Sequence, residues 1–258
     1  MEMLMQQLHF HNRKISESHC INNAFIEATE SYTLPHLKDI QLYKCQFNSD
    51  NFSSMQFDEL GIEFPESLHS AVKSRQSEFL AGRFCASQAV KSLNRSCKQI
   101  PIGENRQPIW PEGLLGSISH VDTSAICAAA IESEYEYLGI DIEHWMKEDI
   151  SNEIRDLVIS QEEELAFKHS NFNDSDLVTL LFSAKESLFK AIYKYVEKYF
   201  GFDAAKLVML DTEKHLLELE IVEDLSDKIR AGSKFTCYFV LHEESVFTIV
   251  CGNLDGKI

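Results

Sequence analysis

Four segments at the end of the chain follow one another with only turns between them, and this succession limits the possible folds most. Residues 206–211, 216–222, 234–242 and 245–253 are short and rich in branched or aromatic side chains, which predicts strands. Because no helical pattern separates them, consecutive strands can pair as antiparallel hairpins. The order of elements therefore favours an α+β fold over a doubly wound parallel sheet.

Two long helices are expected to pack on sheets of this kind. Apolar side chains recur mostly at three- and four-residue steps in residues 66–94, and residues 176–200 carry one apolar stripe. That stripe consists of Leu177, Leu180, Leu181, Ala184, Leu188, Ala191, Ile192 and Tyr195. Ser160 and Glu163 have the spacing of a capping box and predict the start of a shorter helix.

The chain is expected to divide into two halves of similar construction. Further strands are predicted at residues 40–47, 123–131 and 138–143. The acidic stretch 132–137 places the boundary near residue 133, so that the halves are residues 1–133 and 134–258. Each half would hold a small, mainly antiparallel sheet packed with one long helix.

The charge of the chain excludes several classes of partner. The formal net charge is -17, so nucleic acid and an anionic membrane surface would repel the protein. No segment approaches the roughly 20 apolar residues that span a bilayer. The first residues lack the basic start and apolar run of a signal peptide. We expect a cytoplasmic protein with no nucleic-acid partner and no membrane insertion.

The cysteines are typical of reduced thiols in a cytosolic protein. They are odd in number, scattered, and form no C-x-x-C pair. The seven are Cys20, Cys45, Cys85, Cys97, Cys127, Cys237 and Cys251.

Two carboxylates lie one residue apart in the predicted strand "LGIDIE", at Asp141 and Glu143. Positions i and i+2 of a strand share one face and lie roughly 6–7 Å apart. At an effective dielectric constant near 20, their charges would repel by about 2–3 kcal/mol. A solvated edge would tolerate this repulsion, whereas a pocket would require a cation or a shared proton.

Lysines flank a third carboxylate, Glu186, in the long helix of the second half. Lys185 precedes Glu186, and Lys190 follows one turn later. Alone, Glu186 and Lys190 would be read as a surface pair worth a few tenths of a kcal/mol. Together with the strand carboxylates they can build a Mg²⁺ site beside a phosphate-binding site, because Mg²⁺ prefers oxygen ligands and is often completed by phosphates.

Two other chemistries compete with this interpretation. A metal-dependent nuclease is disfavoured by the charge and by His144 and Trp145, which follow Glu143 where a lysine two positions later would be expected. A serine hydrolase is disfavoured because its candidate residues are too close in sequence to form a triad: Ser117, Ser119, His120 and Asp122.

Four segments in this order resemble the 4'-phosphopantetheinyl transferases of the larger, surfactin-synthetase-activating (Sfp) type, and among these the enterobactin synthase component D group. They are "EFLAGRFCASQAV" (78–90), "RQPIWPEGLLGSISH" (106–120), "LGIDIE" (138–143) and "FSAKESLFKA" (182–191). The resemblance implies a fold of two similar halves related by a pseudo-twofold axis. It also implies transfer of phosphopantetheine from coenzyme A to a serine of an apo carrier protein, with release of adenosine 3',5'-bisphosphate.

The resemblance also implies roles for individual residues. Asp141, Glu143 and Glu186 would bind Mg²⁺, with Mn²⁺ as the alternative ion, and Glu186 would also be the base that deprotonates the serine. Lys185 and Lys190 would hold the phosphates of coenzyme A, and Lys190 is counted with Glu186 as catalytic.

The coenzyme A contacts of the first half would come from Arg83, Arg106, Ser119 and His120. Two positions depart from the family pattern: Phe182 stands where Trp is usual, and Ser87 stands where a further basic residue is usual.

Several partners and pathways are compatible with the resemblance. The carriers would be peptidyl, aryl or acyl carriers of siderophore or other secondary-metabolite synthesis. Carriers of polyunsaturated fatty acid or polyketide synthesis are the alternative. A monomer is expected. An inactive carrier-binding protein of the same fold is the alternative from another functional class.

Overall fold

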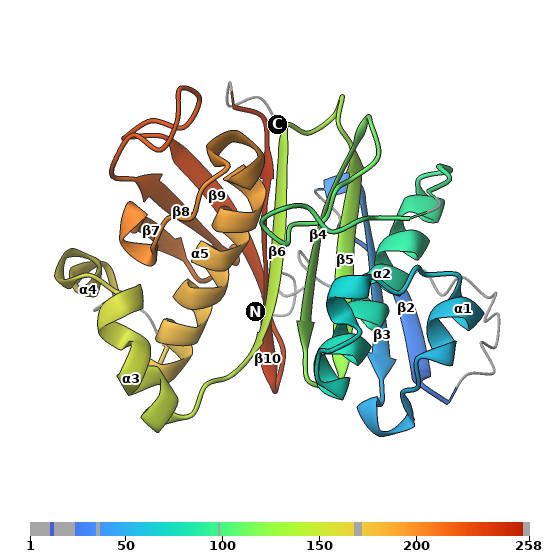
Figure 1. Ribbon diagram of the computed structural model, residues 1–258. Coiled ribbons are helices and arrows are strands. Elements are labelled where there is room, and N and C mark those ends of the chain that lie inside the picture. The colour runs from blue at the N-terminus through green and yellow to red at the C-terminus, as the bar shows by residue number, and fades with distance from the viewer. Residues whose placement is uncertain (1–10, 13–23, 35–36, 98, 168–171, 255–258) are drawn as a thin grey trace. The chain divides into compact units, whose positions relative to one another are not determined.

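The strands of the C-terminal half form one antiparallel sheet. In this computed structural model, which describes residues 11–12, 24–34, 37–97, 99–167 and 172–254, the strand order is β6-β10-β9-β8-β7 (Figure 1). The strands are β6 (Tyr137–His144), β7 (Ala205–Asp211), β8 (Leu216–Ile221), β9 (Lys234–Leu241) and β10 (Ser245–Gly252). All pair with antiparallel neighbours, which confirms the predicted hairpins.

The C-terminal half also contains three helices: α3 (Glu148–Val158), α4 (Gln161–Phe167) and α5 (Asp174–Val196). The predicted long helix is confirmed as α5, which packs along β6 and β10 and buries its leucine stripe (Figure 1). It begins where the side chain of Asn173 accepts a hydrogen bond from the backbone of Asp176. The capping box before α4 is confirmed, since Ser160 and Glu163 exchange hydrogen bonds.

The N-terminal half contains a second sheet, with the order β1-β2-β3-β5-β4. Its strands are β1 (His11–Asn12), β2 (Ile26–Leu34), β3 (Leu37–Phe47), β4 (Leu114–Val121) and β5 (Ser124–Ile131). Helix α1 (Met55–Leu60) is short, and helix α2 (Lys73–Ser92) packs on β3 and β5 (Figure 1).

The prediction of a single helix over residues 66–94 is wrong for the residues before Lys73. Glu66–Leu68 form one 3-10 turn, and α2 begins only at Lys73, after Val72 in an extended conformation. The side chain of Gln76 donates to the carbonyls of Leu68 and Ala71. These bonds satisfy backbone groups of the intervening turn and favour a break over a continuous helix.

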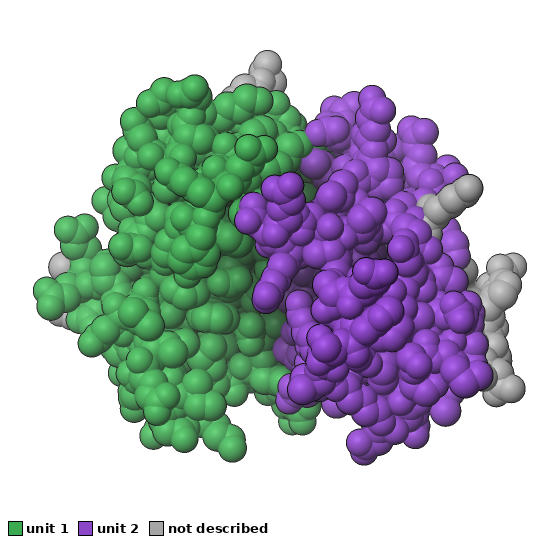
Figure 2. Space-filling view, viewed as in Figure 1, with its two compact units in different colours: residues 1–8, 135–258 green, residues 9–134 purple. Residues whose placement is uncertain are grey.

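The two sheets belong to two compact units, coloured separately in Figure 2. Their described parts are residues 11–134, here the N-terminal unit, and residues 135–254, here the C-terminal unit. Each unit has its own apolar core between its sheet and its long helix, so the α+β class is confirmed.

Two sequence-based expectations concern residues that are only partly described. Six cysteines of the described residues are free thiols, and Cys20 lies outside the described residues. The first ten residues, on which the signal-peptide prediction rests, also lie outside them. Within the described part of the chain, no helix is long and apolar enough to cross a membrane.

Candidate functional site

A glycine lets α5 approach the strand that carries the paired carboxylates. Gly139, Asp141 and Glu143 share one face of β6, because side chains alternate along a strand. A Cβ atom on Gly139 would lie 2.0 Å from the carbonyl oxygen of Ser187 and 2.5 Å from the backbone nitrogen of Ala191. The backbone of α5 therefore rests directly on β6, and the carboxylate face of the strand is covered by this helix.

An ion pair joins the strand to the helix at this point. Nζ of Lys190 lies 2.6 Å from Oδ1 of Asp141. The side chain of Asp141 is 4% exposed and that of Lys190 27%. A buried carboxylate is costly unless it is paired, so the ammonium of Lys190 compensates Asp141 in the protein. The paired carboxylates consequently do not form a fully solvated edge.

The other two carboxylates lie within electrostatic range of this pair. Burial, together with the nearby Asp141 and Glu186, raises the pKa of Glu143 to about 8, against the opposing effect of Lys190. Burial also raises the pKa of Glu186, an effect that Lys190 opposes and Asp141 supports. When ionised, three carboxylates and one ammonium leave two negative charges, which a divalent cation would neutralise.

We call Asp141, Glu143, Glu186 and Lys190 the carboxylate–lysine cluster. Its carboxylates are the hard oxygen donors that Mg²⁺ prefers. Among the described residues, however, no three His, Cys, Asp or Glu side chains are already arranged around one metal position. The cluster fits a magnesium site in chemistry, and the individual ligand roles stay predictions.

Lys185 lies in a different environment from Lys190. Its ammonium is buried, 3.0 Å from Oε1 of Glu163, and donates to the carbonyl of Val158 at 2.7 Å. Glu163 also accepts a hydrogen bond from the backbone of Leu207. Lys185 thus links α5 to α4 and β7 inside the unit, and its role at coenzyme A stays a prediction.

The aromatic position of the family pattern is part of the hydrophobic packing. The ring of Phe182 lies 5.2 Å from that of Phe202, at an interplanar angle of 42°. Phe182 packs against the core of the C-terminal unit.

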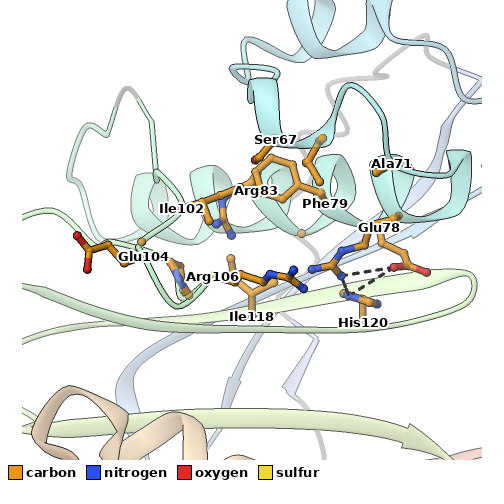
Figure 3. Close-up of a pocket in the computed structure, with 15 residues that line it drawn as sticks. Ser67, Ala71, Glu78, Phe79, Arg83, Ile102, Glu104, Arg106, Ile118 and His120 are labelled. Atoms are coloured by element: carbon orange, nitrogen blue, oxygen red, sulfur yellow. Dashed lines mark hydrogen bonds and ion pairs between the residues drawn. The ribbon is translucent and has the colours of Figure 1, made fainter. Parts of the chain in front are cut away.

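The N-terminal unit contains a basic pocket of about 650 Å³ (Figure 3). Three residues named from the sequence line it: Arg83 of α2, Arg106 of the loop before β4, and His120 of β4. Ser119 is buried but does not line the pocket, because neighbouring residues of β4 point to opposite faces.

Arg83 is held rigidly in this pocket. Its Nε donates to the carbonyl of Ile100 at 2.7 Å, and its guanidinium lies 4.6 Å from the ring centre of Phe79. Burial lowers the pKa of Arg83 to about 10, so the side chain still carries its charge at neutral pH. A fixed cation of this kind suits a phosphate.

Two further polar residues of the pocket, Arg75 and Glu78, were not among the site residues named from the sequence. Glu78 lies 3.7 Å from Arg75 and 3.8 Å from Nε2 of His120, and Arg75 lies 3.5 Å from the same nitrogen (Figure 3). The spacing of Arg75, Glu78, Gly82 and Arg83 places them along one side of a helix, and this signal could have identified them.

Comparisons with known proteins agree with the two units. Residues 64–130 match the 4'-phosphopantetheinyl transferase N-terminal domain, and residues 137–244 match the 4'-phosphopantetheinyl transferase superfamily.

Three curated relatives are similar over most of their length. Enterobactin synthase component D of Salmonella typhi is 33% identical over 69% of this chain and 73% of its own length. The protein of the same name from Escherichia coli strain K12 is 36% identical over 58% of this chain and 69% of its own. The 4'-phosphopantetheinyl transferase Npt of Nocardia iowensis is 30% identical over 57% of this chain and 69% of its own length. The chain belongs to the 4'-phosphopantetheinyl transferase superfamily.

Proposed function

We propose that this protein transfers the 4'-phosphopantetheine group of coenzyme A to a serine of an apo carrier protein and releases adenosine 3',5'-bisphosphate. One observation carries the proposal. In a member of this superfamily, Lys190 of α5 pairs with Asp141 of β6 at 2.6 Å, and Glu143 and Glu186 lie within electrostatic range of this pair. Such a cluster suits reaction at a phosphate.

The transfer is a displacement at phosphorus. The serine oxygen of the carrier forms a bond to the phosphorus that bears the pantetheine arm. The bond from this phosphorus to the bridging oxygen breaks, and that oxygen leaves on adenosine 3',5'-bisphosphate. The serine proton passes to the carboxylate of Glu186, directly or through water. Burial raises the pKa of Glu186, which makes this carboxylate a better proton acceptor.

Asp141, Glu143 and Glu186 are the residues that would hold Mg²⁺, with Mn²⁺ as the alternative. When bound, the ion would supply neutralisation of the charge on the phosphates. Lys190 would pair with a phosphate oxygen when its ammonium turns from Asp141 towards the substrate. Its side chain is partly exposed, so this movement does not require the core to open. Lys185 would assist only if its buried pair with Glu163 were broken.

The basic pocket would bind the nucleotide end of coenzyme A. Arg83, Arg106 and His120 were proposed for this role from the sequence, and Arg75 adds a fourth basic side chain. Phe79 provides an aromatic surface beneath the guanidinium of Arg83. Phosphate oxygens and a flat base would both find partners there.

The carrier is proposed from the names of the relatives. Two of those described above are called enterobactin synthase component D, which favours a carrier of siderophore synthesis. Carriers of other secondary-metabolite, polyketide or polyunsaturated fatty acid synthesis are the alternative. The net charge of -17 gives no long-range attraction to an acidic carrier, so docking would depend on apolar contacts or on local lysines.

The experiment that tests the proposal is intact-mass analysis of apo carriers after incubation with the protein, coenzyme A and Mg²⁺. A panel of siderophore, polyketide and fatty-acid carriers would identify the partner class. A gain of one phosphopantetheine group, lost with EDTA and restored by added Mg²⁺, is expected. A folded protein that modifies none of these carriers would support the inactive carrier-binding alternative instead.

A further inference from the structure

Helix α5 carries a buried row of hydroxyl groups on the side that faces the sheet. Thr179, Ser183 and Ser187 are one turn apart and fully buried. The rest of the buried surface of α5 is largely Leu, Ile and Ala. A buried hydroxyl without a hydrogen-bond partner is unfavourable, so each of these groups must have a specific partner.

The partner of both serines is Thr248, a fully buried residue of β10. Its Oγ1 lies 2.9 Å from Oγ of Ser183 and 2.7 Å from Oγ of Ser187, and it donates to the carbonyl of Ser183 at 2.9 Å. With its proton given to this carbonyl, the oxygen of Thr248 can accept from both serines. The three hydroxyls therefore form one network between helix and strand, in which Oγ of Ser187 also lies 3.2 Å from the carbonyl oxygen of Thr248.

This network lies beside the carboxylate–lysine cluster. Thr248 stands directly opposite Asp141 in the β6–β10 ladder, and directly opposite residues of an antiparallel pair project from the same face of the sheet. Ser183 and Ser187 flank Glu186 in α5. The carbonyl of Ser187 is also the atom that lies against Gly139.

Apolar packing alone would not define the position of α5 accurately. Hydrophobic contacts are non-directional, whereas hydrogen bonds weaken steeply when distance or angle changes. A displacement of reacting groups by about 1 Å can reduce a rate by about 100-fold. The hydroxyl network is a directional link between α5 and β10, and it lies beside Asp141 because Thr248 is the register partner of that residue.

We propose that Thr248, through Ser183 and Ser187, is a positioning residue that fixes the register of α5 on the sheet. It would thereby set where Glu186 and Lys190 lie relative to Asp141 and Glu143. This inference rests on the proposed function, because it concerns the same metal-binding and catalytic groups.

The test is Thr248→Val, which keeps the shape of the side chain and removes the hydroxyl. The matched control is Thr179→Val, because Thr179 is an equally buried threonine of α5, one turn before Ser183. Thr179 instead donates to the carbonyl of Ser175 and accepts from the backbone of Met146. Two readouts are needed: Mn²⁺ affinity by calorimetry, and the rate of carrier modification at saturating Mg²⁺.

For Thr248→Val we expect about tenfold weaker Mn²⁺ binding and about tenfold slower carrier modification. Thr248→Ser, which retains the hydroxyl, should restore both. Thr179→Val should lower the melting temperature similarly while both readouts stay within about twofold of the wild type. If Thr248→Val does not fold, Ser183→Ala, which removes one hydrogen bond of the network and favours helix, should show a smaller loss of both.

The outcomes separate this inference from the proposed function. If the folded Thr248→Val and Thr179→Val variants have the same Mn²⁺ affinity and the same rate of carrier modification, the positioning role is overturned, even with an active wild type. A wild type that binds Mn²⁺ but modifies no carrier would contradict the proposed function, and the Mn²⁺ affinities would still decide the positioning role. A wild type that binds no Mn²⁺ would overturn the positioning role together with the metal site.

Discussion

Substitution of Glu143 by Gln tests whether the carboxylates of β6 and α5 repel one another in the metal-free protein. The buried environment and the nearby Asp141 and Glu186 raise the pKa of Glu143 from 4.5 to about 8. Between these pH values the folded state therefore binds a proton that the unfolded state has lost. The free energy of unfolding falls as the pH rises through this window. Glutamine has the same shape and no charge, so this loss should vanish.

The expected magnitude follows from the shift of the pKa. One pKa unit corresponds to about 1.4 kcal/mol, so the full shift would give at most about 5 kcal/mol. Glu143 is partly exposed, and solvent screens its interactions, so we expect about 2 kcal/mol. In a chain of this size, that difference raises the melting temperature by roughly 4–8 °C.

The assay is thermal unfolding in EDTA at pH 5, 6, 7 and 8. Glu143→Gln should match the wild type near pH 5 and become progressively more stable towards pH 8. Glu153→Gln, an exposed substitution in α3 with the same change of charge, is the control for net charge. With Mn²⁺ at pH 8 the order should reverse, because only the wild type keeps the ligand. Parallel curves for the wild type and Glu143→Gln in EDTA would refute the reasoning.

Three other substitutions test separate parts of the structure. Lys185→Met should lower the free energy of unfolding, measured in urea, by about 3 kcal/mol, because Glu163 is left buried without its cation. An unchanged stability with a raised KM for coenzyme A would instead support a contact between Lys185 and a phosphate. Gly139→Ala should destabilise the protein by at least about 3 kcal/mol, since its Cβ would lie 2.0 Å from a helix carbonyl, and a wild-type melting temperature would contradict this packing. Arg75→Ala should raise the KM for coenzyme A about tenfold with little change in kcat. A fall in kcat alone would contradict a role of Arg75 in binding the nucleotide.

The types of the main elements could be predicted because their patterns are local. The leucine stripe of α5 and the short apolar segments of β7 to β10 each require only a few neighbouring residues to be recognised. The same local rule placed Asp141 and Glu143 on one face of β6. Helix α3 was missed although Ile150, Ile154 and Leu157 have helical spacing.

The partners of the site residues could not be predicted, because they depend on segments far apart in the sequence. Thr248 lies more than 60 residues from the serines that it joins, and Glu163 lies 22 residues from Lys185. A sequence pattern shows that Lys185 and Lys190 lie in one helix. It does not show that one ammonium is enclosed with Glu163 while the other lies on Asp141. The different environments of the two lysines result from the packing of α5 within the unit.

The most direct measurement of the proposed transfer follows both products in one reaction. Apo carrier, coenzyme A, Mg²⁺ and the protein would be incubated, and the carrier mass and the released adenosine 3',5'-bisphosphate would be quantified together. We predict one nucleotide released for each phosphopantetheine group gained by the carrier, and loss of both products with Glu186→Gln. Release of nucleotide without a gain in carrier mass, or transfer that is unchanged in Glu186→Gln, would contradict the account.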